Sequence, residues 1–200
     1  MAESSTYSSL TGDSVSLAPW RKDGCVIEGE SFLLEPFKAA HVTEAYVSWL
    51  NDPEVTQYTR HGQSVYSLEK AQAYAAAVSN SPVTLVWAIR RKSDGLHAGN
   101  ISLNDISWAH HSGEISVLIG EKKCWGGGAA TESVRLITSF AFDSLDLHRV
   151  FVGMTVTNLA MIAVAKKNSF QEEGRLRDAF FKNGKYVDVT QWSKLNPKHG

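Results

Sequence analysis

The sequence predicts an α/β (α+β) fold, in which helices pack on a central mixed sheet. Segments of alternating polarity, typical of strands, are interspersed with segments whose apolar residues recur every three or four positions, typical of amphipathic helices. Their order along the chain is strand, two helices, three strands, helix, strand, helix and two strands. This order does not match a regular alternation of strands and helices, so we expect antiparallel as well as parallel pairing.

The composition is that of a globular protein with little net charge. Of the 200 residues, 43% are hydrophobic, and 20 Lys and Arg nearly balance 21 Asp and Glu, for a formal net charge of −1. This argues against nucleic acid or an anionic membrane surface as a partner held by bulk charge, but leaves room for a local anion site. Cys25 and Cys124 lack the spacing of a zinc site, so we expect no metal.

We expect a cytoplasmic protein with one domain. No apolar run approaches the ~20 residues that span a membrane, and the polar start of the chain lacks the apolar core of a signal peptide. Residues 1–25 are rich in Ser, Thr and Gly and are interpreted as a polar N-terminal extension, either mobile or packed on the domain. Residues 26–197 are interpreted as the domain itself.

The first half of the domain predicts a strand and two helices. Residues 31–35 form the strand, closed by Pro36. One helix lies within 39–55 and ends at Asn51-Asp52-Pro53, because the residue before proline disfavours the helical region. The other follows Ser67, which can cap it. The apolar faces of the two helices consist of Val42, Ala45, Tyr46 and Trp49, and of Leu68, Ala71, Ala75 and Val78.

The second half predicts most of the sheet. Strands are expected over 83–90, 98–106, 114–120 and 150–156, with a polar turn between the second and third. A helix follows the third strand, and another starts at Asn158 and ends at Lys166-Lys167. The chain closes with a hairpin, in which Asn183-Gly184 suits the two positive φ angles of a type I′ turn.

The strongest local signal is the glycine-rich stretch 123–130, between a strand and a helix. Glycines there allow a tight turn and bring backbone N–H groups close to a ligand, and the helix adds the positive end of its dipole. The stretch therefore predicts a site for phosphate or pyrophosphate, although a plain strand-to-helix turn is the alternative. It is neither a Walker A loop nor a GxGxxG dinucleotide loop.

Five segments of the chain resemble the RimJ/RimL-like branch of the GNAT acetyltransferase superfamily, in the order found there. The stretch KCWGGGAATES resembles the branch's glycine signature, and 158–170 resembles its asparagine-led helix closed by phenylalanine. SWLNDPEV and HAGNISL, with the KNGKYVDV hairpin, are also typical of the branch. The resemblance covers about 31–195. It implies the GNAT fold: a mixed sheet of about seven strands, helices on both faces, and a V-shaped split between the fourth and fifth strands.

The resemblance also implies acetyl-CoA as co-substrate. The pantetheine arm would lie along the fourth strand, and Asn158 would bond its amide. Lys166 would reach the nucleotide end, although an interaction with the C-terminus of its helix explains that lysine equally well. The residues implied in binding are Val117, Leu118, Ile119, Lys123, Cys124, Trp125, Gly126, Gly127, Gly128, Ala129, Ala130, Asn158 and Lys166.

The implied reaction is direct attack of an amine on the thioester, and here the sequence departs from the family. Ala165 stands where many members have a tyrosine that protonates the leaving thiolate, and Met161 stands where the branch often has serine. Either water or another residue discharges the thiolate, or the chain only binds CoA. Glu114 is the first candidate for the base and His111 the second, while a salt-bridged strand residue is the alternative for Glu114.

By location, the acceptor site is expected from the linker between the first two helices, the polar turn 107–113 and the C-terminal hairpin. Its candidates are Tyr58, Arg60, His61, Trp108, His110 and Phe181. Aromatic rings with Arg and His suit a sugar ring with a phosphate or nucleotide tail, and they also suit a short peptide. The SWLNDPEV segment is similar to that of acetyltransferases acting on amino sugars, so the resemblance implies an amino sugar or a nucleotide-linked amino sugar. The alternatives are a protein N-terminal acetyltransferase of the ribosomal-protein type and a non-catalytic CoA-binding protein. The partner is thus expected to be a small-molecule amine, with a homodimer compatible with the sequence.

Overall fold

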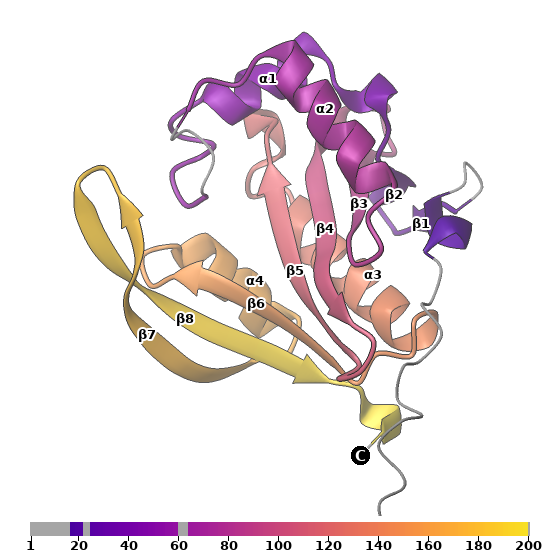
Figure 1. Ribbon diagram of the computed structural model, residues 1–200, viewed down its shortest axis with the longest axis vertical. Coiled ribbons are helices and arrows are strands. Elements are labelled where there is room, and N and C mark those ends of the chain that lie inside the picture. Colours follow the sequence, from indigo (N-terminus) through magenta and orange to yellow (C-terminus); the bar gives the residue numbers. More distant parts are fainter. Residues whose placement is uncertain (1–16, 22–24, 60–63, 200) are drawn as a thin grey trace, which may run out of the picture.

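A computed structural model describes residues 17–21, 25–59 and 64–199. Within these residues, a single eight-stranded sheet runs through the molecule (Figure 1). The strands are β1 (Ile27–Glu28), β2 (Phe32–Pro36), β3 (Leu85–Arg91), β4 (His97–Ser107), β5 (Ser112–Ile119), β6 (Arg149–Thr155), β7 (Gln171–Lys182) and β8 (Lys185–Leu195). The helices are α1 (Glu44–Asn51), α2 (Leu68–Ser79), α3 (Ala129–Asp143) and α4 (Leu159–Lys167), with short 3₁₀ turns at Ala18–Arg21, Ala39–His41, Lys122–Cys124 and Pro197–His199.

The strand order is β1-β2-β3-β4-β5-β6-β8-β7. All neighbours are antiparallel except β5 and β6, which are parallel. Parallel strands need a long crossover connection, and α3 provides it. The predicted mixed sheet and GNAT fold are confirmed. The count of about seven strands missed β1, whose two residues are too few for an alternating pattern to show.

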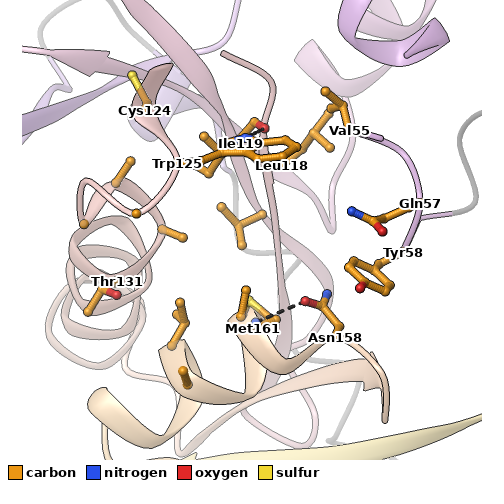
Figure 2. Close-up of a pocket in the computed structure, with 18 of the residues that line it drawn as sticks. Val55, Gln57, Tyr58, Leu118, Ile119, Cys124, Trp125, Thr131, Asn158 and Met161 are labelled. Atoms are coloured by element: carbon orange, nitrogen blue, oxygen red, sulfur yellow. Dashed lines mark hydrogen bonds between the residues drawn. The ribbon is translucent and has the colours of Figure 1, made fainter. Parts of the chain in front are cut away.

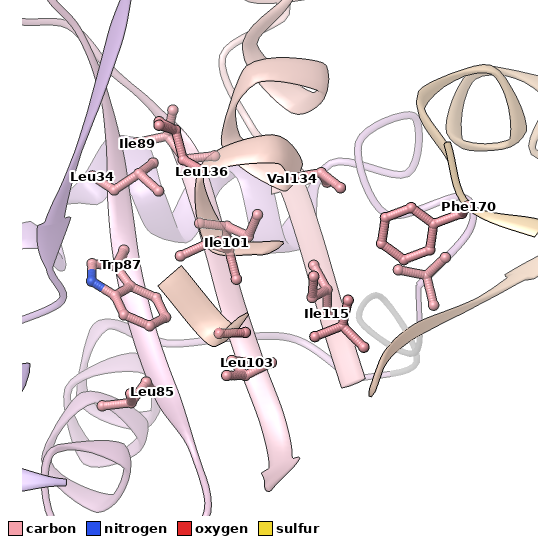
Figure 3. Close-up of a cluster of buried hydrophobic side chains, with 14 of the residues drawn as sticks. Leu34, Leu85, Trp87, Ile89, Ile101, Leu103, Ile115, Val134, Leu136 and Phe170 are labelled. Carbon is pink, nitrogen blue, oxygen red and sulfur yellow. The ribbon is translucent and has the colours of Figure 1, made fainter. Parts of the chain in front are cut away.

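Helices cover both faces of the sheet, and β3 shows why. Trp87 and Ile89 belong to the main core, which α3 covers, whereas Ala88 belongs to a second core under α1 and α2. Successive strand residues point to opposite faces, so one strand serves both cores. Figure 3 shows the main core, to which β4 contributes Ile101 and Leu103 and α3 contributes Val134 and Leu136.

The helix boundaries follow their caps. Thr43 Oγ1 accepts a hydrogen bond from Tyr46 N at 3.2 Å, so α1 begins at Glu44. Val42, predicted on the helix face, therefore lies outside α1, although it is buried in the same core. The predicted cap of α2 is confirmed, because Ser67 Oγ accepts from Lys70 N at 3.2 Å. Leu68, however, is 41% exposed, so it does not belong to the buried face of α2.

The predicted hairpin turn is also confirmed. Asn183 and Gly184 have φ angles of 53° and 75°, as a type I′ turn requires. They connect β7 to β8 as one long ribbon at the edge of the sheet (Figure 1). The tip of this ribbon lies beside the linker between α1 and α2, which matters for the site below.

Part of the predicted N-terminal extension packs on the domain. Leu17 is 2% exposed within the main core. The Trp20 ring meets Phe140 of α3 edge-on, with centroids 5.3 Å apart, and Arg21 donates to Thr84 O at 2.8 Å. These contacts tie 17–21 to two elements of the domain, and the boundary at residue 25 stays a prediction. In the described part of the chain, no helix has the length and apolarity to cross a membrane.

Candidate active site

The site originates where β5 and β6 part. The two strands pair only over Ser112–Glu114 and Arg149–Phe151. Beyond Glu114, β5 continues to Ile119 in register with β4 alone, while β6 continues in register with β8. The β6-facing edge of residues 115–119 thus borders a gap, and its backbone groups can pair with an extended ligand as another strand would.

A cavity of about 380 Å³ lies against the end of β5 that borders this gap (Figure 2). Its walls come from four segments: the α1–α2 linker, the end of β5, the glycine loop with the start of α3, and α4. The lining residues are Glu54, Val55, Gln57, Tyr58, Thr59, Val117, Leu118, Ile119, Cys124, Trp125, Gly126, Gly128, Ala129, Ala130, Thr131, Asn158, Ala160, Met161, Ala163, Val164 and Lys167. The wall is mainly apolar, with polar groups concentrated on the linker and at the helix ends.

The glycine loop turns through two left-handed residues. Gly126 has φ 73° and Gly128, the N-cap of α3, has φ 85°. L side chains rarely adopt such angles, and nothing lies within 4 Å of where a Cβ would stand at either position. The loop therefore presents bare backbone at the N-terminus of a helix of 15 residues, where first-turn N–H groups have no intrahelical partner.

Several backbone amides of the glycine loop already donate hydrogen bonds within the protein, so fewer of them can bind an anion. Three loop amides already donate to backbone carbonyls: Cys124 N to Glu121 O at 2.9 Å, Trp125 N to Lys122 O at 3.0 Å and Gly127 N to Cys124 O at 3.2 Å. Lys123 N donates to the carboxylate of Glu121 at 3.3 Å. The amides left as candidates are those of Gly126, Gly128, Ala129 and Ala130.

Cys124 is suited to packing rather than to chemistry. Its side chain is 3% exposed and belongs to the main core. Burial raises the pKa of the Cys124 thiol, which disfavours the nucleophilic thiolate. Acyl transfer through this cysteine is therefore not supported by its surroundings, in agreement with the sequence interpretation.

Asn158 opens α4 and lines the cavity. Its Oδ1 accepts a hydrogen bond from Met161 N at 3.1 Å, the dashed line in Figure 2. The amide therefore caps the helix with its oxygen, which leaves Nδ2 as the group that could donate to a ligand. The motif thus has a structural function as well as the binding function that the resemblance implies.

The two departures from the family lie on different sides of α4. Met161 lines the cavity, so its thioether occupies space where a hydroxyl would stand in a serine-bearing relative. Ala165 has no exposed surface and packs in the main core. The position expected for a tyrosine is thus closed by its neighbours, and neither residue can donate a proton.

The two lysines at the end of α4 point in different directions. The Lys166 ammonium lies over the Trp192 ring, 5.8 Å from its centroid, and does not line the cavity. Lys167 does line it. Consecutive helical residues point about 100° apart, so the nucleotide-end lysine expected at 166 is better placed at 167.

The acceptor candidates are only partly brought together. Tyr58 lies in the cavity wall, facing Asn158 in Figure 2. Arg60 and His61 fall outside the residues that the structure describes. Trp108, His110 and His111 occupy the β4–β5 turn, and the cavity lies at the other end of β5. Six residues of strand separate His111 from Val117, on the order of 20 Å, so this turn does not reach the cavity.

The side chain of Phe181 lies on the face of β7 that is turned away from the site. Its ring packs on Tyr186, with centroids 4.7 Å apart, and the two side chains are 51% and 66% exposed. Phe180 and Lys182, its neighbours on β7, point to the opposite face, because strand side chains alternate. The Lys182 ammonium contacts the α1–α2 linker, so that face, and not the face of Phe181, is turned toward the site.

Glu114 lies at the closed end of the split. It is the last residue of β5 in register with β6, and its Oε1 lies 3.7 Å from where a Cβ on Gly153 would stand. The missing side chain at Gly153 leaves room for the carboxylate over β6. Among the predicted catalytic residues, Glu114 is therefore adjacent to the split, whereas His111 is in the remote turn.

Sequence reasoning missed much of the wall. The linker residues Gln57 and Thr59 lie outside the motifs, while Glu54, Thr131 and Val164 lie within motifs but were not singled out as site residues. The spacing of Ala160, Met161, Ala163, Val164 and Lys167 marks one broad face of α4, but periodicity alone does not say whether such a face meets a core or a ligand.

Comparison with known proteins agrees with this geometry. The family model described as "Acetyltransferase (GNAT) domain" matches residues 31–171. The chain is 34% identical to YdaF of Bacillus subtilis over 51% of its length and 55% of that protein. It is 30% identical to the spermidine N(1)-acetyltransferase of Vibrio cholerae over 50% of its length and 58% of that protein. The matches thus span little more than half of these relatives.

A solved structure shares the fold over nearly its whole length. It is RimL, a ribosomal L7/L12 alpha-N-protein acetyltransferase in complex with coenzyme A, with a TM-score of 0.78 and 22% identity. The superposition covers 85% of this chain and 97% of that one. At this identity the likeness establishes the fold, while the acceptor has to be argued from the residues.

Proposed function

Because the chain belongs to the GNAT acetyltransferase domain family, we propose that it transfers the acetyl group of acetyl-CoA to a primary amine of a small molecule. The observation that carries the proposal is the cavity at the end of β5, beyond its pairing with β6, which joins a bare helix N-terminus to an open strand edge. These features suit the two parts of one ligand: a pyrophosphate on backbone amides, and an extended amide-bearing arm along a strand.

The residues present fit acetyl-CoA. Gly126 and Gly128 leave open space beside the candidate amides, and Lys167 adds a positive charge at the end of α4. Leu118, Met161 and Val164 provide an apolar wall for the pantetheine arm, and Nδ2 of Asn158 can donate to one of its carbonyls. When bound, the thioester supplies an activated acetyl group, and the chain supplies orientation and proton transfer.

Glu114 is the proposed base. An alkylammonium with a pKa near ~10 is almost wholly protonated at neutral pH, so its proton has to leave before the nitrogen can attack. The carboxylate lies at the closed end of the split, beside Gly153. Direct attack in a ternary complex then forms the C–N bond and breaks the C–S bond.

The oxyanion and the leaving group need separate partners. A backbone N–H of Leu118 or Ile119 is the proposed donor to the oxyanion, since both residues line the cavity. Met161 and Ala165 cannot protonate a thiolate. We therefore assign its discharge to water, which the open mouth beside the 36%-exposed Tyr58 admits.

The acceptor class we propose is an amino sugar, free or nucleotide-linked. Gln57, Tyr58 and Thr59 offer an aromatic face and hydrogen-bonding groups that suit a hydroxylated ring. Among the described lining residues, Glu54 is the one carboxylate, and Lys122 already pairs with it at 2.5 Å and with Asp52 at 2.8 Å. A polyamine or a basic peptide would need unpaired carboxylates at this wall.

The test is thiol release from acetyl-CoA with four acceptor sets: amino sugars, nucleotide-linked amino sugars, spermidine and short peptides. We expect turnover with a sugar amine that Glu114→Gln lowers by about 100-fold or more. Turnover with spermidine or peptides alone would overturn the acceptor class and keep the reaction. Tight acetyl-CoA binding without turnover on any amine would leave a CoA-binding protein and refute the transferase.

A further inference from the structure

The side chain of Lys182 fastens the β7–β8 hairpin to the α1–α2 linker. The Lys182 Nζ donates hydrogen bonds to the carbonyl oxygens of Thr56 and, at 2.9 Å, Thr59. Lys182 is the last residue of β7, directly before the Asn183-Gly184 turn. Figure 1 shows the tip of the hairpin on the same side of the molecule as the linker. The contact therefore joins segments more than 120 residues apart at the acceptor end of the cavity.

The two carbonyls bracket the acceptor wall. Gln57 and Tyr58 lie between Thr56 and Thr59, and both line the cavity. Figure 2 shows the Tyr58 ring beside Asn158 and the Gln57 side chain directed into the cavity. Holding the backbone on both sides of Gln57 and Tyr58 fixes the distance between this wall and α4.

Other hydrogen bonds support the two ends of the linker, and at its far end Asn51 pairs with the backbone of Tyr66. The Asp52 carboxylate accepts a hydrogen bond from Glu54 N at 2.9 Å. The backbone carbonyl of Asp52 accepts another from Thr56 Oγ1 at 2.8 Å. After Thr56, the backbone hydrogen bond from Thr59 N to Thr56 O, at 3.0 Å, closes a local turn. Lys182 therefore anchors this turn to the rest of the molecule.

Lys182 is suited to this role by its surroundings. Its ammonium bonds to the linker carbonyls, and burial there lowers the pKa of the group. A partly desolvated cation bonded to two carbonyls is a strong, directional contact. Lys185, its partner across the turn, is exposed and provides a matched lysine.

We propose that Lys182 is a positioning residue for the acceptor, which sets the Gln57–Tyr58 wall at the distance from Asn158 that the amine-bearing molecule requires. The inference rests on the proposed acetyl transfer and adds a specificity device to it. Lys182 acts through the linker backbone and touches neither the thioester nor its carbonyl. Its loss should weaken acceptor selection and leave acetyl-CoA binding intact.

The experiment compares Lys182→Met with Lys185→Met in the full chain. We expect Lys182→Met to raise KM for the acceptor by about tenfold, with KM for acetyl-CoA unchanged, and to speed hydrogen exchange of the amides of 56–59. Lys185→Met should alter none of these. Lys182→Arg, which keeps charged donors, should restore part of the acceptor affinity.

The outcomes separate the two proposals. Unchanged exchange in Lys182→Met would show that the contact does not hold the linker, and faster exchange with an unchanged acceptor KM would refute the positioning role. An equal loss of affinity for both substrates with a lower melting temperature would indicate a merely structural role. If the wild type acetylates no amine, the proposed function fails, while hydrogen exchange still decides whether Lys182 holds the linker.

Discussion

The indole Nε1 of Trp125 donates a hydrogen bond to the carbonyl oxygen of Ile119, at 2.9 Å. The bond folds the glycine loop back on the last residue of β5, and both residues line the cavity. The two parts of the proposed acetyl-CoA site, strand edge and loop, are thereby held in one fixed relation.

Trp125→Phe should loosen this relation. It removes the Nε1 donor and keeps an aromatic ring, so the carbonyl of Ile119 loses its partner while the apolar contact largely persists. We expect acetyl-CoA affinity to fall by about three- to tenfold, the equivalent of one hydrogen bond, measured by calorimetry. Affinity equal to wild type would show that the bond does not contribute to the site.

Gly128→Val should abolish acetyl-CoA binding. The substitution places a branched side chain at φ 85°, on the N-cap of α3 and beside the candidate amides. Gly95→Val is the matched control, because Gly95 also has a positive φ, 70°, and open space around it, but lies in the β3–β4 turn. Both variants carry a strain of about 1–2 kcal/mol.

Comparing the two variants separates the effect on the binding site from the effect of backbone strain. Similar melting temperatures with binding lost only in Gly128→Val would support the loop as the anion site. Binding retained in Gly128→Val at wild-type strength would refute that assignment.

Two substitutions separate the two functions of Asn158, helix capping and ligand binding. Asn158→Asp keeps an oxygen that caps α4 for Met161 N, but removes the Nδ2 donor. We expect it to retain stability and to bind acetyl-CoA about tenfold more weakly. Asn158→Ala removes both groups and should also lower the free energy of unfolding by about 1 kcal/mol.

Denaturant unfolding and calorimetry on the same samples provide the measurement. If the Asp variant binds acetyl-CoA as well as wild type does, Asn158 is a helix cap only, and the binding role that the resemblance implies is wrong.

Stability should fall on mild acidification because of His97. Its ring lies 5.0 Å from the Trp49 ring and 5.6 Å from the ring of His41, centroid to centroid. Its Nε2 donates a hydrogen bond to Asn100 Oδ1 at 2.9 Å. Burial is the main cause that lowers the pKa of His97 below its ordinary 6.5. The other charged groups close to it are Arg90 and Glu35, which pair with each other.

The sign follows from proton uptake. Between its lowered folded pKa and 6.5, the unfolded chain binds more protons at this position, so stability rises with pH across that window. We therefore expect the free energy of unfolding to drop as pH falls through 6.5 and to level off below the folded pKa. His97→Gln should flatten this slope, whereas the same change at exposed His110 should leave it unchanged. An equal slope in all three proteins would contradict the assignment.

Most of the local structure was readable from the sequence because its signals are short-range. Ser67 and Asn158 begin helices through hydrogen bonds to backbone groups three residues away. The glycine loop and the Asn183-Gly184 turn follow from the positive φ angles that only a few residues accept. These preferences belong to the backbone itself, so they hold whatever surrounds them.

The residues that line the site were harder to predict from the sequence, because they depend on which face of a helix or strand meets the cavity. Lys167 rather than Lys166 lines it, and Phe180 with Lys182 rather than Phe181 faces the linker. A shift of one residue rotates a helical side chain by about 100° and a strand side chain to the other face. Only the packing of the whole element determines that rotation.

The sequence by itself determined the order of the helices and of the strands after β1, the caps at Ser67 and Asn158, the Asn183-Gly184 turn, and the glycine loop on which a pyrophosphate is proposed to bind. The tertiary structure decided that β5 and β6 part after Glu114, that the turn with His110 and His111 lies far from the resulting cavity, and that Lys182 reaches Thr59. The first set depends on contacts within a few residues. The second depends on sheet register and on contacts across more than 120 residues, which no local pattern encodes.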